Sequence, residues 1–224
     1  SVEINMKKIL LYTVRTIAVL ICLMFIWRVI FAENKSTLSK LSPTDTLCAA
    51  YAENGNIELL THDVVDEISD NGYFSAYAFV YSPETSELQV TVRYNNSTVN
   101  ALGDVEFRLF TVDSSSGKEA TNVSGGDAGV DENGGRTYQG HPAGDDVFPT
   151  VAEKTKKLFY NYERLVFDGI EIGENTNVII TICKAGAAKN DQTYEAAVTA
   201  HFAEQPMKNY KLSNSEKALL EGKE

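Results

Sequence analysis

Acidic side chains gather among glycines in one segment, residues 124–146 (SGGDAGVDENGGRTYQGHPAGDD). Carboxylates are the oxygen ligands that Ca²⁺ prefers, and glycine lets a chain turn tightly around an ion. The candidate ligands are Asp127, Asp131, Asp145 and Asp146. Their spacing matches neither an EF-hand loop nor the glycine-rich calcium repeat. A long surface loop, a calcium site and a partner-contacting loop are therefore all open interpretations of this segment.

Two of the three cysteines, Cys48 and Cys183, lie outside the apolar N-terminal segment and could form a disulfide. Such a bond would stabilise the fold by about 4–5 kcal/mol in the chain-entropy model. The alternative is that each thiol is buried separately as a small apolar side chain. The sequence leaves both open, because it does not show whether the two Cα atoms come within bonding distance.

The sequence contains no catalytic motif that identifies a reaction. It has no G-x-S-x-G turn, no H-E-x-x-H helix, no Walker loop and no dinucleotide fingerprint after a strand. His62 has carboxylates beside it but no second ligand at metal-binding spacing, which favours a solvated acidic turn. We therefore expect no enzyme and no cofactor apart from the possible calcium; an extracytoplasmic hydrolase is a remote alternative.

The longest apolar run is residues 9–32 (ILLYTVRTIAVLICLMFIWRVIFA), which holds only two charged side chains. A bilayer core of about 30 Å needs about 20 helical residues, so this run predicts one transmembrane helix. Lys7, Lys8 and Arg15 stand towards its N-terminal side, so the positive-inside rule places the N-terminus in the cytoplasm and the bulk of the chain outside. A cleaved signal peptide fits less well, because the run is long and Ile30 stands where a small residue is expected.

Arg15 lies within this run and has two open interpretations. A guanidinium in a membrane helix can pair with an acidic group of another membrane protein, which would make the anchor part of an assembly. It can also extend along the helix to lipid phosphates at the interface.

The net charge of the chain is −11, and residues 1–32 hold four basic side chains and one acidic one, so the remainder carries −14. This balance excludes the basic footprint of a nucleic-acid-binding protein and disfavours adhesion to anionic headgroups. The expected partners are membrane lipid around the anchor and another envelope or membrane protein.

Alternating apolar residues after the anchor predict antiparallel strands with one face in the core and the other in solvent. The expected strands are residues 57–61, 73–81, 88–94, 104–113, 118–123, 154–167, 178–183 and 193–202. The run 154–167 changes register, which predicts a bulge or two strand pieces. A helix is expected over 43–54 with Ser42 as its N-cap, and a short one after Ser213, where an S-x-x-E capping box occurs.

These elements predict five parts. They are a cytoplasmic N-terminus (1–8), a transmembrane anchor (9–32), a tether (33–42), an extracytoplasmic β-sandwich (43–205) with the long loop 124–146, and a C-terminal tail with a short helix (206–224).

Several short strands separated by turns, with little helix, predict a mainly β fold, an antiparallel β-sandwich with short flanking helices. In architecture, residues 56–202 resemble the immunoglobulin-like domains that many Gram-positive bacteria carry outside a single membrane anchor. The antibody Cys-Trp-Cys core is absent, since Trp27 lies in the anchor. The resemblance implies an anchored extracytoplasmic interaction or scaffold protein of a cell-envelope assembly. The alternative is a ligand- or calcium-binding sensor or accessory subunit of a membrane complex.

Overall fold

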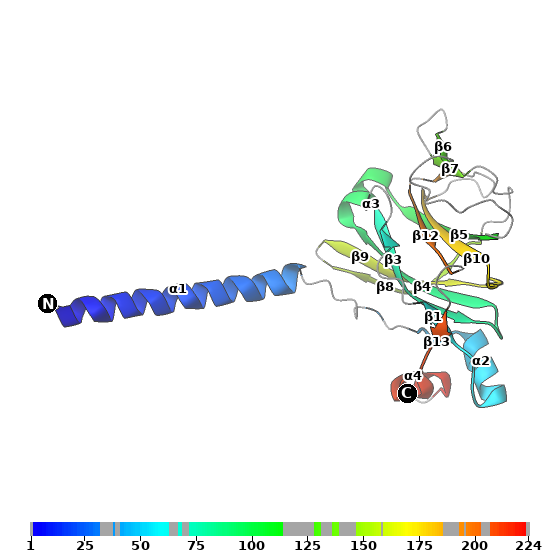
Figure 1. Ribbon diagram of the computed structural model, residues 1–224, viewed down its shortest axis with the longest axis horizontal. Coiled ribbons are helices and arrows are strands. Elements are labelled where there is room, and N and C mark those ends of the chain that lie inside the picture. Colours follow the sequence, from blue (N-terminus) through cyan, green and yellow to red (C-terminus); the bar gives the residue numbers. More distant parts are fainter. Residues whose placement is uncertain are drawn as a thin grey trace. The chain divides into compact units, whose positions relative to one another are not determined.

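The chain forms two compact units, Ser1–Ser36 and Thr37–Glu224. The computed structural model describes residues 2–31, 38, 41–62, 67–68, 72–113, 128–130, 136–138, 147–157, 159–185, 193–194, 196–202 and 207–222. The first unit holds one long helix, and the second is mainly β (Figure 1).

The helix of the first unit is α1 (Val2–Phe31). Its segment Leu10–Trp27 is 18 residues long, has a mean hydropathy of 2.1 and buries none of its length. Apolar side chains exposed along a helix are stable where the surrounding solvent is itself apolar. Within the described residues this is the one helix long and apolar enough to cross a bilayer, and it coincides with the predicted run 9–32.

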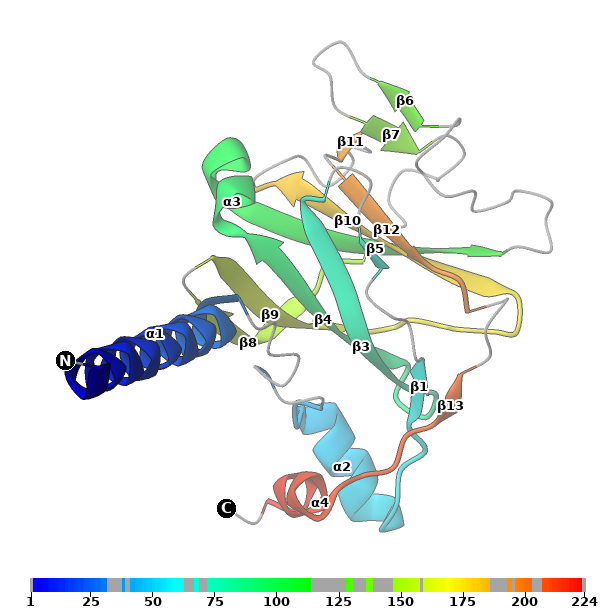
Figure 2. The same ribbon diagram turned by 60° about the vertical axis from the view of Figure 1, so that its left-hand side comes forward.

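The larger sheet of the second unit is antiparallel throughout (Figure 2). Its strands run in the order β13 (Lys208–Asn209), β1 (Leu60–His62), β3 (Phe74–Ser82), β4 (Glu87–Asn95), β9 (Tyr160–Phe167) and β8 (Thr150–Lys156), and β2 (Glu67–Ile68) also pairs with β3. The predicted strand 154–167 is therefore two strands joined by a tight hairpin, and the first of them begins earlier than predicted.

A second antiparallel sheet has the order β12 (Ala196–Ala200), β10 (Thr176–Lys184) and β5 (Val105–Asp113). Three short strands form a third: β11 (Thr193–Tyr194), β7 (Arg136–Tyr138) and β6 (Ala128–Val130). Two of these, β6 and β7, lie inside the segment predicted as a long loop.

One hydrophobic core lies between the two larger sheets. Alternate residues of β4 and β10 enter it, namely Leu88, Val90, Val92 and Tyr94 from the first and Val178, Ile180 and Ile182 from the second. The rings of Phe74 and Phe107 meet edge-on across it, with centroids 5.5 Å apart. The prediction of a mainly β fold built from antiparallel sheets is confirmed.

The outer face of the larger sheet is covered by other elements. The alternation of apolar and polar residues along its strands had predicted that this face is exposed to solvent. Gln89 and Thr91 of β4 are 1% and 2% exposed. The covering elements are α2 (Asp45–Asn54) and α4 (Asn214–Leu220), which lie side by side in Figures 1 and 2. Leu41 and Leu220 pack with them against Val80 of the sheet. The prediction of a solvated face was wrong because these helices and the chain before them bury it.

Local signals predicted the helix ends in part. The N-cap of α2 is Thr44, whose hydroxyl accepts a hydrogen bond from the backbone N–H of Leu47, and not Ser42 as predicted. Gly55 ends α2 with a left-handed φ of 67°, a conformation that glycine adopts without strain. The capping box of Ser213 and Glu216 is confirmed at α4. A further helix, α3 (Asn96–Leu102), occupies a segment predicted as a turn.

Candidate functional site

The predicted calcium ligands Asp127, Asp131, Asp145 and Asp146 lie outside the described residues, so the structure does not test them. Among the residues that it does describe, no group of three or more His, Cys, Asp and Glu side chains could hold a metal ion. His62 is 5% exposed, with its ring centroid 4.7 Å from that of Phe202. The solvated turn predicted there is wrong at His62, because this side chain packs on the core.

The disulfide considered between Cys48 and Cys183 is not formed, and both are free thiols. Cys48 lies on α2 and packs with the helices over the larger sheet. Burial first, and then the nearby carboxylates of Asp45 and Glu87, raise the pKa of the Cys48 thiol. Cys183 is buried on β10 of the other sheet. The structure therefore does not bring the two sulfurs together.

Arg15 lies within the apolar segment of α1, whose side chains are exposed along the segment's whole length. The pairing of Arg15 with an acidic group of another membrane protein is not tested by the structure and stays a prediction.

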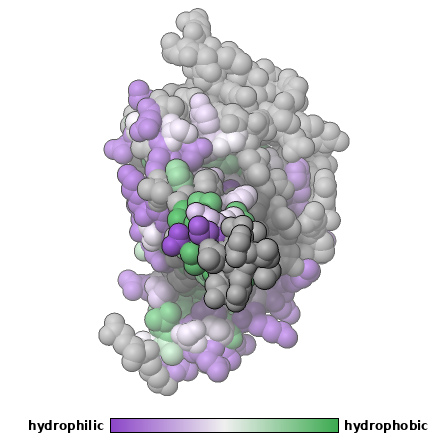
Figure 3. Space-filling model, turned by 90° about the vertical axis from the view of Figure 1, so that its left-hand side faces the viewer, coloured by the Kyte–Doolittle hydropathy of each residue, from purple (hydrophilic) through white to green (hydrophobic). Residues whose placement is uncertain are grey.

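Two of the exposed large apolar side chains of the β unit lie in or just after one strand, β8. Hydrophilic residues cover much of the described surface in Figure 3. Against this background Val151, in β8, is 47% exposed and Phe159, just after it, is 43% exposed. Within the described part of the chain, β8 pairs with β9 on one side and forms the edge of the larger sheet.

Along β8, the backbone N–H and C=O groups of successive residues point alternately towards β9 and away from it. The N–H of Lys157 donates to the carbonyl of Tyr160 at 2.8 Å, which closes the hairpin to β9. Because hydrogen-bonded and non-hydrogen-bonded pairs alternate in an antiparallel ladder, the N–H and C=O of Lys156 and Lys154 point away from β9. These groups are the ones that a further strand would bind.

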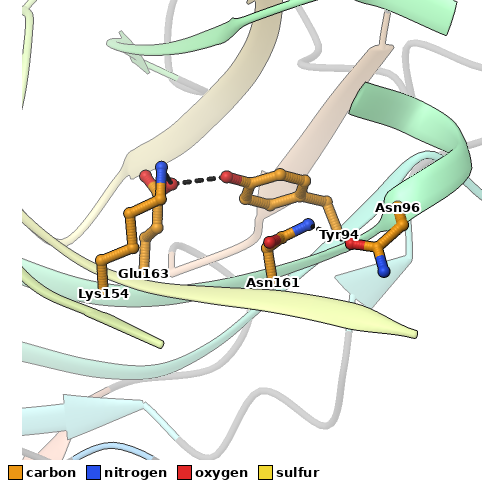
Figure 4. A network of polar contacts seen from close by, with 5 residues as sticks. All are labelled: Tyr94, Asn96, Lys154, Asn161 and Glu163. Carbon is orange, nitrogen blue, oxygen red and sulfur yellow. Dashed lines mark hydrogen bonds and ion pairs between the residues drawn. The ribbon is translucent and has the colours of Figure 1, made fainter. Parts of the chain in front are cut away.

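A buried polar network lies behind this edge (Figure 4). The Tyr94 hydroxyl donates to Glu163 Oε1 at 2.5 Å, and Lys154 Nζ lies 2.5 Å from the same oxygen. Asn161 donates from Nδ2 to Oδ1 of Asn96, the first residue of α3, at 2.8 Å. Lys154 thus connects the edge strand β8 to the interior of β9, and these contacts fix the position of the edge.

This network is structural in character. Tyr94 is 2% exposed, and the Glu163 side chain is 6% exposed, so both groups are held inside the domain. Burial, followed by the hydrogen bond to Glu163 and its negative charge, raises the pKa of Tyr94 far above its ordinary range. The hydroxyl therefore stays protonated and keeps donating to the carboxylate.

A second buried cluster lies on the outer face of the same sheet, around Arg164. This side chain is 0% exposed. Its Nη1 donates to the carbonyl of Ala78 at 2.7 Å and to Thr91 Oγ1 at 2.8 Å, and its Nε donates to Gln89 Oε1 at 3.3 Å. Among the residues that the structure describes, its Nη2 has no hydrogen-bond partner. Burial lowers the pKa of Arg164 to about 10, so the guanidinium is a buried cation at neutral pH.

Ala78 adopts a backbone conformation that is unusual for an L-residue, with φ of 52°. It lies where the pairing of β3 with β4 shifts register between Tyr77 and Val80. Such bulges reorient backbone groups, and the carbonyl of Ala78 reaches Arg164. The strained residue therefore supplies one of the few acceptors of the buried cation.

The chain segment before α2 lies across this cluster. Leu38 packs with Tyr77 and Tyr162, and Leu41 is 2% exposed. The backbone N–H of Ser42 donates to Gln89 Oε1 at 2.8 Å, and Gln89 Nε2 donates to the carbonyl of Ser42 at 2.8 Å. The described part of the predicted tether 33–42 is thus packed on the domain, and the compact unit begins at Thr37.

A groove with a volume of about 500 Å³ is formed by described residues of the β unit. Its walls are mainly apolar, from Leu60, Ile172, Phe202 and Met207, with Glu174 and Asn175 among the other lining residues. The residues described as lining it include no nucleophile paired with a base.

Comparisons with protein-family models, curated proteins and solved structures give no significant match.

Neither cluster was identified from the sequence. Glu163 and Arg164 are adjacent charged residues in a run that otherwise reads as a strand, and they face opposite sides of the sheet. The available signal was a pair of neighbouring charged residues within a strand that has apolar residues on both of its faces. Charged residues are rarely fully buried without partners, so such a pair indicates buried polar contacts.

Proposed function

We propose that this chain is a membrane-anchored interaction protein of the cell envelope, whose β domain binds an extended segment of another envelope or membrane protein along β8. The apolar helix α1 is retained as the anchor, and the domain lies outside the membrane. The observation that carries the proposal is an ordered sheet edge whose outward backbone groups, at Lys154 and Lys156, have no strand beside them among the described residues.

We also propose that the domain is an immunoglobulin-like sandwich. Constant-type immunoglobulin domains have strands A-B-E-D in one sheet and G-F-C in the other. Seven strands support this assignment, because β3, β4, β5, β8, β9, β10 and β12, lettered A to G, have these orders. The chain departs from antibody domains at Cys183, which alternates with the core residues Ile180 and Ile182 and so faces away from the core.

Strand addition suits the geometry of β8. A peptide that pairs with an edge strand gains main-chain hydrogen bonds, and side-chain pockets give the specificity. Val151 and Phe159 offer exposed apolar surface at the two ends of the strand region. The ion pair of the exposed Lys154 with the buried Glu163 holds the edge in place before binding, which lowers the ordering entropy that binding has to offset.

The basic charge of the β8 edge favours a partner segment with acidic side chains. Residues 150–157 carry Lys154, Lys156 and Lys157 against Glu153, which makes this strip basic in a domain that is otherwise acidic. Lysines on an exposed edge also oppose pairing between copies of the same strand. The partner segment is therefore extended, with carboxylates interspersed among apolar residues.

Site-specific crosslinking tests this proposal. A photoreactive side chain at Val151 of the full-length protein, in its own membranes, should form a product with one other envelope or membrane protein. Lys156→Pro removes the outward N–H and leaves the hydrogen bonds to β9 in place, so it should abolish the product. Lys156→Ala is the matched control, since it removes the same charge and keeps the N–H.

Loss of the product with proline and its retention, in whole or in part, with alanine support strand addition. Equal yields from the proline and alanine variants, or no product from the parent protein, would show that β8 does not bind a partner strand.

A further inference from the structure

The segment that precedes α2 is held on the domain by a side chain that imitates a strand. The amide of Gln89 makes two hydrogen bonds of 2.8 Å with the backbone of Ser42, one as acceptor and one as donor. This is the pattern by which neighbouring strands exchange a pair of hydrogen bonds. Residues 41–44 together with Leu38 are called the strap below.

The orientation of the Gln89 amide is fixed from two sides. Its Nε2 also donates to Glu87 Oε1 at 2.7 Å, and its Oε1 also accepts from Arg164 Nε at 3.3 Å. Glu87 in turn accepts from the Thr44 hydroxyl at 2.7 Å through Oε2. Each end of the amide thus contacts the strap and a buried charged residue, so the amide cannot turn over without losing both sets of contacts.

The docked strap keeps two charged groups from water. Glu87 is 1% exposed and Arg164 is 0% exposed, and neither forms an ion pair of 4 Å or less with the other. Burial is the main cause that raises the pKa of the Glu87 carboxyl. Burying charged groups whose hydrogen-bond partners are neutral is costly, and rehydration recovers part of that cost. Release of the strap therefore gives back free energy that partly offsets the loss of apolar contacts by Leu38 and Leu41.

We infer that Gln89 is a latch, oriented by Arg164 and Glu87, that holds the strap in a docked state from which it is released locally while the rest of the domain stays folded. Release exposes Gln89, Glu87 and the pocket of Leu38. The latch is independent of β8 and of the partner proposed there.

Hydrogen exchange of the full-length protein in detergent micelles at neutral pH tests the latch. Gln89→Leu keeps a similar volume and removes both hydrogen bonds to Ser42. It should speed exchange of the strap amides, those of Leu38, Leu41, Ser42 and Thr44, by about tenfold or more, the change expected when such bonds are lost, while β9 and β10 stay protected. Val90→Ala is the matched control, because this neighbouring residue faces the core on the opposite side of the sheet.

The control should lower the stability of the whole domain and leave exchange in the strap within about twofold of the parent. Two results would show that the strap opens only when the domain unfolds. One is strap exchange at the parent rate in Gln89→Leu, and the other is an equal acceleration of strap exchange in Val90→Ala. If Gln89→Leu does not fold, Ser42→Pro removes the donor from the strap and leaves the sheet unchanged. Its remaining amides should show the same acceleration, and the parent rate there would overturn the latch.

Discussion

Two buried clusters place charged residues on opposite faces of one strand, β9. Glu163 faces the core, forms an ion pair with Lys154 and accepts a hydrogen bond from the hydroxyl of Tyr94. Arg164 faces the helices and is held by neutral acceptors. At the residue scale, the stability of the domain depends on whether these groups keep their partners, because an unpaired buried charge costs more than a missing surface contact.

Tyr94→Phe removes the donor that the buried Glu163 carboxylate accepts from at 2.5 Å. We expect the free energy of unfolding to fall by about 1–3 kcal/mol, because the acceptor loses a partner that water cannot replace. Urea denaturation measures the change. Tyr160→Phe is the control, since that ring is half-buried and packs on Tyr162 and Arg93, and the cost there should stay within about 0.5 kcal/mol. Equal losses in the two variants would contradict the role of the network.

Alkaline pH should destabilise the domain through two tyrosines. Burial, and then a hydrogen-bonded carboxylate, raise the pKa of Tyr94 and of Tyr210 above the ordinary value. An unfolded tyrosine titrates near about pH 10, so above that pH the unfolded state loses protons that the folded state keeps. The free energy of unfolding must therefore fall as the pH rises.

Urea denaturation at several pH values between about 9 and 11 measures this effect. The decline should be shallower in the double variant Tyr94→Phe/Tyr210→Phe. The same slope in parent and variant would show that these hydroxyls do not carry the pH dependence.

The sequence could not show that Arg164 and Gln89 are buried. Alternation in β4 correctly assigns Leu88, Val90 and Val92 to the core. It also predicts that the opposite face is exposed to solvent. A two-residue alternation distinguishes the two faces of a strand but does not show which elements cover the second face. That cover comes from α2, α4 and the strap, which are distant in sequence from β9, so no local pattern records it.

At the scale of elements, Thr44 links helix formation to the sheet. Its hydroxyl caps α2 by accepting from Leu47 and donates to the buried Glu87. Ser213 caps α4 in an exposed position. The two caps therefore differ in what they leave unpaired when they are removed.

Thr44→Ala should destabilise the domain more than Ser213→Ala. Loss of an N-cap costs about 1 kcal/mol in either helix, and the loss of the hydrogen bond to the buried Glu87 Oε2 adds about 1–2 kcal/mol in the first. Thermal or urea unfolding of the two variants gives the comparison. An equal loss would mean that the hydrogen bond to Glu87 contributes nothing to stability.

Most strands could be predicted because their apolar residues alternate over five residues or more, as in β4 and β5. The split of 154–167 into β9 and part of β8 was signalled only by a change of register, which also fits a bulge. α3 (Asn96–Leu102) was missed because its sequence NSTVNAL has polar, weakly helical residues. Its first turn is held by side-chain bonds such as the Thr98 hydroxyl to the carbonyl of Tyr73, which depend on the folded sheet.

At the scale of the whole molecule, the chain divides into an apolar helix and an acidic β domain. This division was predictable, since hydropathy and length alone distinguish the two parts. The residue at which the domain begins was not predictable from the sequence. The predicted tether ran to residue 42, whereas Leu38, Leu41 and Ser42 are buried on the domain because Gln89 and the neighbouring tyrosines bind them.

The proposed partner depends on the proposed topology, in which α1 anchors the chain and the β domain lies outside the membrane. Protease added to intact cells that express the full-length protein tests it most directly, with a cytoplasmic protein as the protected control. We expect the β domain to be digested before the cells are opened, while a fragment containing α1 stays in the membrane fraction. A domain that survives until lysis, or a mature protein without α1, would contradict the account.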